Sequence, residues 1–121
     1  MSMPVIDHFK HSGDIVAYKA GEHIFDVGEP DDKMYAVKSG EVDILFNGIV
    51  FETVGPGGIL GEKSLLDDKP HTTTAIAKTD CEIVPVDEKR FLFLVHETPT
   101  FALQVMRVMS ERTRTMMQTM L

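Results

Sequence analysis

Short extended segments separated by glycine-containing turns most restrict what this chain can fold into. Five such segments follow one another over residues 14–54, and two more lie at residues 73–77 and 82–86. The turns carry glycine, proline, aspartate or asparagine, as in Gly28-Glu29-Pro30-Asp31-Asp32. Strands of about five or six residues with turns every ~8–12 residues are typical of sandwiches and barrels. The sequence therefore predicts a mainly β fold, an antiparallel β-roll (a double-stranded jelly roll) over about residues 13–86.

The pair Asn47-Gly48 predicts a tight hairpin between two of these segments. Asn-Gly favours a two-residue turn whose positive φ angles match the twist of the flanking strands. With that turn, we expect Ile44 to pair with Phe51 on a shared apolar face. Asp43 and Glu52 would then lie on the opposite, polar face.

Residues 55–77 contain the strongest candidate for a binding site. Four glycines fall within seven residues there and let the backbone turn sharply: Gly55, Gly57, Gly58 and Gly61. The next residues, Glu62 to Leu66, are long enough for one or two helical turns. A glycine-rich turn that opens into a short helix exposes unpaired amide N–H groups to an anion. Residues 70–74, Pro-His-Thr-Thr-Thr, then bring an imidazole and hydroxyls back to a phosphate-sized pocket with a carboxylate on one side.

Residues 87–121 are predicted to be helical. Asp87 is a typical N-cap for a helix over 88–95, and Thr98-Pro99 begins a last helix. Alternating three- and four-residue spacing on that helix is typical of a coiled-coil seam. We therefore expect a homodimer interface at Met106, Met109, Thr113, Met116 and Met120. The alternative is that the methionines fill gaps in a single core; the polar residues around Arg112 are interpreted as keeping the helix soluble.

Length and charge exclude several functional classes. The 121 residues are enough for one domain over 1–121, with 19 acidic against 12 basic residues. An acidic chain without a basic patch is a poor non-specific binder of nucleic acid. No apolar run approaches the ~20 residues needed to cross a bilayer, and one cysteine allows no internal disulfide. The spacing of the histidines does not indicate a metal site, and the sequence has no nucleophile or triad pattern that would indicate an enzyme. Because it has one cysteine and no apolar run long enough for a bilayer, we expect a soluble cytoplasmic protein.

The motifs together resemble those of the cyclic-nucleotide-binding domain family, as found in bacterial catabolite activator proteins, kinase regulatory subunits and nucleotide-gated channels. The matching runs are Ala20-Gly21-Glu22, Gly28 to Tyr35, Gly55-Pro56-Gly57, Gly61-Glu62 and Cys81-Glu82-Ile83. The resemblance covers nearly the whole chain. It implies a β-roll with a short phosphate-cassette helix and C-terminal helices.

The resemblance also implies roles for individual residues. Glu62 matches the glutamate that accepts a hydrogen bond from the ribose 2′-hydroxyl, and Thr72 matches a residue that touches phosphate or base. His71 stands where the family has an arginine that pairs with the phosphate, and Lys63 stands where an aliphatic residue is usual. The expected ligand-binding set is Gly61, Glu62, Lys63, Ser64, His71, Thr72 and Thr73.

Two functions follow from this reading. The first is a regulatory sensor that binds cAMP or cGMP, needs no cofactor and signals through its C-terminal helices. The second is an interaction or dimerisation module that has lost nucleotide binding, because histidine lacks the permanent charge and the fork of arginine. The chain ends at Leu121, without a recognition helix, so direct DNA binding is not expected.

Overall fold

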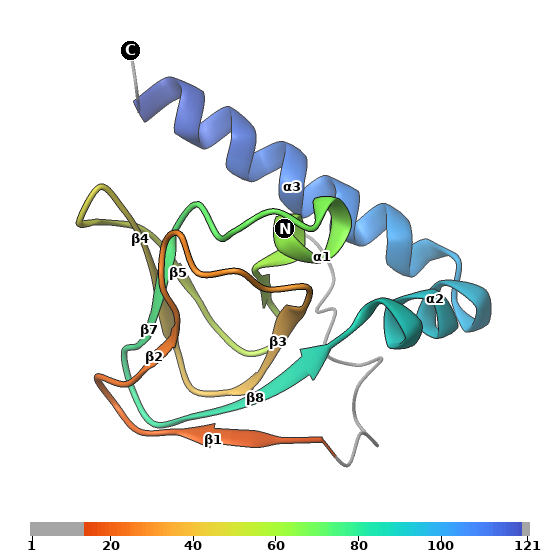
Figure 1. Cartoon of the computed structure of the whole chain (residues 1–121), viewed down its shortest axis with the longest axis horizontal. Helices are drawn as coiled ribbons and strands as arrows, with labels where there is room; N and C mark the ends of the chain where they lie inside the picture. Colours follow the sequence, from red (N-terminus) through yellow and green to blue (C-terminus); the bar gives the residue numbers. More distant parts are fainter. Residues whose placement is uncertain (1–13, 120–121) are drawn as a thin grey trace.

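Two antiparallel four-stranded sheets face one another in the computed structural model, which describes residues 14–119 (Figure 1). One sheet has the order β1-β8-β3-β6 and the other β2-β7-β4-β5. The strands are β1 (Val16–Tyr18), β2 (His23–Phe25), β3 (Met34–Ser39), β4 (Val42–Phe46), β5 (Ile49–Val54), β6 (Ile59–Leu60), β7 (Thr74–Ala77) and β8 (Cys81–Val86). The predicted β-roll is confirmed, and β6 is a strand that the sequence analysis did not predict.

Strands β3 and β8 are covered on both faces. Val37 and Ile83 point into the core between the two sheets, whereas Ala36 and Val84 point into a second core under the helices. Neighbouring side chains on a strand alternate between faces, so each strand serves both cores. All four side chains are fully buried.

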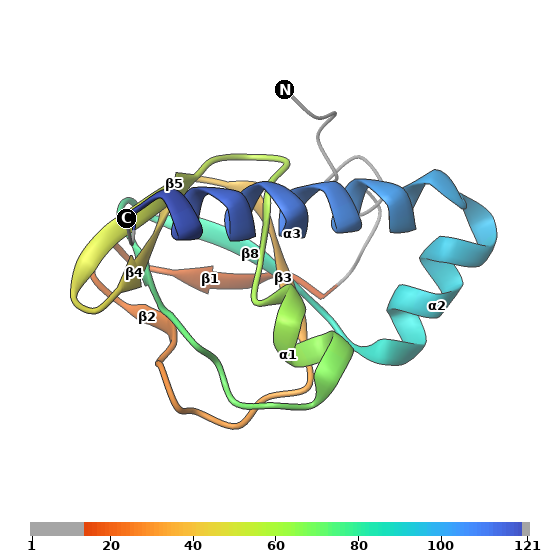
Figure 2. The ribbon, with the colours of Figure 1, turned by 90° about the horizontal axis from the view of Figure 1, so that it is seen from above.

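The chain continues from β8 into two helices, α2 (Glu88–Glu97) and α3 (Thr100–Thr119). The predicted cap of α2 is confirmed, because the Asp87 carboxylate accepts a 2.8 Å hydrogen bond from the backbone N–H of Arg90. Phe101 and Val105 of α3 close the second core. Helix α3 therefore lies along the roll, past the short helix α1 (Glu62–Asp67), as Figures 1 and 2 show.

The β4–β5 hairpin turns at Asn47-Gly48 as predicted, with both residues at positive φ. The predicted pairing of Ile44 with Phe51 is wrong, since Ile44 lies opposite Glu52. A register shift between Ile44 and Leu45 leaves an extra residue on β5, which is the signature of a β-bulge. The bulge matters for the site, because the Glu52 carboxylate reaches α3 instead of the face that the sequence predicted.

Candidate functional site

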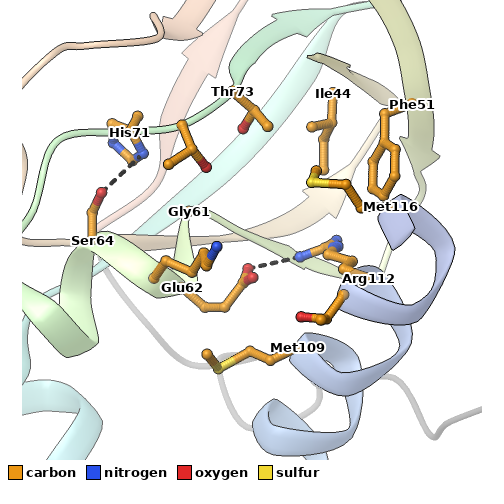
Figure 3. A pocket seen from close by; sticks show the side chains of 13 residues that line it. Ile44, Phe51, Gly61, Glu62, Ser64, His71, Thr73, Met109, Arg112 and Met116 are labelled. Carbon is orange, nitrogen blue, oxygen red and sulfur yellow. Dashed lines mark hydrogen bonds and ion pairs between the residues drawn. The ribbon is translucent and has the colours of Figure 1, made fainter. Parts of the chain in front are cut away.

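A pocket lies between residues 61–73, called here the cassette, the β4–β5 hairpin and helix α3 (Figure 3). The pocket is partly open to solvent. The structure brings all seven residues of the expected ligand-binding set to its wall. The lining residues are Ile44, Phe51, Gly61, Glu62, Lys63, Ser64, His71, Thr72, Thr73, Met109, Arg112, Thr113 and Met116.

Gly61 starts the cassette and precedes α1 with a left-handed backbone, φ 72°. A Cβ atom there would lie 3.1 Å from the Cε1 atom of His71 and 3.2 Å from the Cε2 atom of Phe25. Both the backbone conformation and the space therefore require glycine at this position. This tight turn is what brings Glu62 to the pocket.

Glu62 is buried at the pocket wall and is bound from α3. Its Oε1 atom accepts a 2.7 Å hydrogen bond from Nη1 of Arg112, and the two side chains are 7% and 14% exposed (Figure 3). Within residues 14–119, the other carboxylate oxygen, Oε2, accepts no hydrogen bond. Glu62 thus keeps one free acceptor while the ion pair fixes its orientation.

Arg112 joins helix α3 to β5, β6 and α1. Its Nε atom donates to Glu52 Oε1 at 2.9 Å, and its Nη2 atom donates to the Ile59 carbonyl at 2.5 Å. Burial disfavours the guanidinium cation, but Glu62 and Glu52 outweigh that effect and raise the pKa of Arg112. The guanidinium is therefore a permanent charge held between two carboxylates.

Sequence reasoning missed Arg112 as a site residue and interpreted it as solvent-facing. A signal was present, because Arg112 lies three residues after Met109 and four before Met116. Residues at such spacing share a face of a helix, and Met109 and Met116 also line the pocket. Knowing which face of α3 meets the roll would have identified Arg112.

The His71 side chain points away from the pocket centre toward Ser64 (Figure 3). Its ring stacks on Phe25 with centroids 3.7 Å apart and is 2% exposed. The Nε2 atom lies 2.9 Å from Asp31 Oδ2, and Nδ1 lies 3.2 Å from Ser64 Oγ. Both ring nitrogens are therefore engaged within the protein.

The hydrogen bonds around His71 connect its ring to a hydroxyl and to a carboxylate. The Ser64 hydroxyl donates its one proton to the Lys69 carbonyl at 2.8 Å, so toward Nδ1 it acts as an acceptor. Asp31 is an acceptor when ionised. Burial would raise the pKa of Asp31, but hydrogen bonds from Tyr35 and His71 outweigh it and lower that pKa. The His71 ring is therefore held between the Ser64 hydroxyl and the Asp31 carboxylate.

The residues expected at a dimer seam lie in different surroundings. Met109, Thr113 and Met116 line the pocket, and Met106 is 56% exposed. Met120 lies outside the described residues. The homodimer therefore stays a prediction. Among the expected seam residues that the structure describes, Met106 is exposed and does not line the pocket.

Two features are absent from the described part of the chain, a membrane-spanning helix and a group of metal ligands. No helix within residues 14–119 combines the length and hydropathy needed to span a bilayer. Over the same range, no group of three or more histidine, cysteine, aspartate or glutamate side chains is placed to hold a metal ion.

The two-sheet roll with a pocket beneath a C-terminal helix defines a β-roll domain. The family model described as "Cyclic nucleotide-binding domain" matches residues 15–98. The chain belongs to the cyclic nucleotide-binding domain family, and the resemblance seen in the sequence is confirmed.

Relatives of known description agree with this assignment. The chain is 36% identical over 80 residues to a cAMP-dependent protein kinase regulatory subunit of Aspergillus niger, covering 64% of this chain and 20% of that protein. It is 31% identical over 105 residues to a cGMP-dependent protein kinase of Plasmodium berghei, covering 86% and 12% respectively. The chain thus spans a fifth or less of these proteins.

A solved structure supports the fold alone. The catabolite activator protein of Thermus thermophilus superposes with a TM-score of 0.79 at 24% identity. The match covers 98% of this chain and 62% of that one. This structural match extends through helix α3, whereas the family model ends at residue 98.

Proposed function

We propose that this domain is a regulatory sensor that binds a cyclic nucleotide, cAMP or cGMP, in the pocket between the cassette and α3. The observation that carries the proposal is the free Oε2 atom of Glu62, an acceptor on a buried side chain at the pocket wall. In the family, the matching glutamate accepts the ribose 2′-hydroxyl. The relatives named for cAMP and for cGMP leave both bases as candidates.

A signal through the C-terminal helices is part of the same proposal. Four α3 residues line the pocket: Met109, Arg112, Thr113 and Met116. A ligand that contacts Glu62 also changes the surroundings of Arg112, because the two side chains share an ion pair. A ligand shifts an equilibrium only through a difference in contacts between states, and these contacts supply one.

The test is a calorimetric titration of the 121-residue protein with cAMP and with cGMP, beside the Glu62→Gln variant. Removing a charged acceptor from a hydroxyl should weaken binding by about 1–3 kcal/mol, or roughly five- to a hundredfold. The variant also loses the charge that Arg112 faces, so Arg112→Gln is the matched control for that side effect. Unchanged nucleotide affinity in Glu62→Gln would remove Glu62 from the site and the main support for the proposal.

The engaged state of His71 favours the second candidate, a dimerisation or interaction module without nucleotide binding. Both nitrogens of the ring are satisfied by Asp31 and Ser64, which leaves the ring without a free donor for a phosphate. This candidate predicts no heat of binding with either nucleotide. It also predicts a homodimer that Met106→Glu, a charge placed on the exposed surface of α3, converts to monomer in sedimentation.

A further inference from the structure

The cations around the pocket differ in what already binds them. Three residues with basic side chains line it, namely Lys63, His71 and Arg112. Arg112 is held by Glu52, Glu62 and the Ile59 carbonyl. His71 is held by Asp31 and Ser64. Within residues 14–119, Lys63 has no ion pair or side-chain hydrogen bond.

The position of Lys63 has no explanation in local structure. It lies in the first turn of α1, where the exposed N–H groups favour acidic rather than basic side chains. Asp67, one turn along α1, binds the backbone N–H of Lys69 instead. A residue that breaks a local rule without a visible gain is a candidate for function.

An anionic ligand needs such a cation in this pocket. The chain carries a net charge of −7, and Glu62 keeps a free carboxylate oxygen at the pocket wall. Arg112 faces two carboxylates, so its cluster is negative overall, and His71 faces the Asp31 carboxylate. The negative cluster around Arg112 would therefore repel an anionic ligand in the pocket, because like charges repel at short distance. Lys63 is therefore the one lining cation within residues 14–119 whose charge no internal carboxylate offsets.

We propose that Lys63 pairs with the phosphate of a bound cyclic nucleotide. An arginine at position 71 would otherwise have this role. This inference rests on the function proposed above. An exposed lysine on a flexible stem adds attraction for the single charge of a cyclic phosphodiester without the fixed fork of arginine. The expected specificity is for the phosphate, not for the base.

The experiment compares Lys63→Met with Lys69→Met by titration with cAMP, cGMP, adenosine and guanosine. Lys69 is a matched control, because it is an exposed lysine of the same cassette that does not line the pocket. We expect Lys63→Met to weaken nucleotide binding by about ten- to a hundredfold, as for the loss of a charge-assisted bond. Nucleoside binding should change by less than about twofold, and Lys63→Arg should bind within about fivefold of wild type.

Each outcome separates this inference from the function on which it rests. If the wild type binds cAMP or cGMP and Lys63→Met matches Lys69→Met, the role of Lys63 is overturned while the sensor function stands. Equal weakening of nucleotides and nucleosides also overturns it, because that result indicates damage to the pocket. A wild type that binds neither nucleotide overturns both proposals.

Discussion

Two ion pairs hold the cassette from its two sides, and they connect it to different parts of the molecule. His71–Asp31 ties the cassette to the β2–β3 connection, where Gly28 and Glu29 add two backbone hydrogen bonds. Arg112–Glu62 ties the cassette to α3 (Figure 3). The first connection is within the β-roll, whereas the second spans the boundary between roll and helix. Of these two connections, only the second reaches the C-terminal helices.

The difference also explains how a histidine can replace an arginine in the cassette. The His71 ring fills space against Phe25 at 3.7 Å and binds Asp31 beneath it. It thereby supports the loop from inside. In the proposal made above, Lys63 supplies the charge that an arginine at position 71 would offer to a ligand.

The largest expected effect is on the roll–helix connection. Arg112→Met leaves the Glu62 and Glu52 carboxylates without their partner. Removing one member of a fully buried pair costs about 3–5 kcal/mol, and since Glu52 is 38% exposed, we expect about 2–4 kcal/mol here. Urea unfolding measures this loss. Arg107→Met, an exposed change on the same helix, is the control, and equal losses in the two variants would contradict the assignment.

How much of this the sequence could predict depends on how local each feature is. The Asn47-Gly48 turn and the Asp87 cap follow from neighbouring residues, and both are confirmed. The bulge that directs Glu52 toward α3 depends on packing across two strands, so alternation alone mispredicted it. Arg112 meets Glu62 across 50 positions in sequence, and no short-range pattern reports such a contact.

A similar limit applies to His71. Its position in the cassette was predicted, but its orientation depends on Phe25 and Asp31, which come from β2 and the β2–β3 connection, far from it in sequence. The sequence analysis treated Asp31 as part of a turn. The buried acid and the buried histidine explain one another only once the fold brings them together.

A smaller effect is expected within the roll. Asp31→Asn should destabilise the protein by about 1–3 kcal/mol near neutral pH, the range for hydrogen bonds to charged groups. The pKa of Asp31 is lowered in the folded state, so its contribution is complete above the usual aspartate pKa of ~3.9 and is lost as pH falls through the lower folded value.

Unfolding midpoints at several pH values check this sign. The gap between wild type and Asp31→Asn should be constant near neutral pH and should close in the acid range below about pH 4. Asp32→Asn is the control, because that neighbouring carboxylate is exposed and, within residues 14–119, forms an ion pair with Lys33 alone. A gap that widens as the pH falls would show that Asp31 is not the stabilised anion described here.

The smallest expected effect is the coupling between the two ion pairs. The Arg112 cluster and the His71 cluster share no hydrogen-bonding side chain, although both contact α1 through Glu62 and Ser64. Independent sites add within about 0.3–0.5 kcal/mol, so the double variant Arg112→Met/Asp31→Asn should lose the sum of the two single losses within that margin. A double-mutant cycle in urea measures the difference. Coupling above about 1 kcal/mol would mean that the two ion pairs are not independent. Helix α1 would then connect the roll and α3 as one rigid unit.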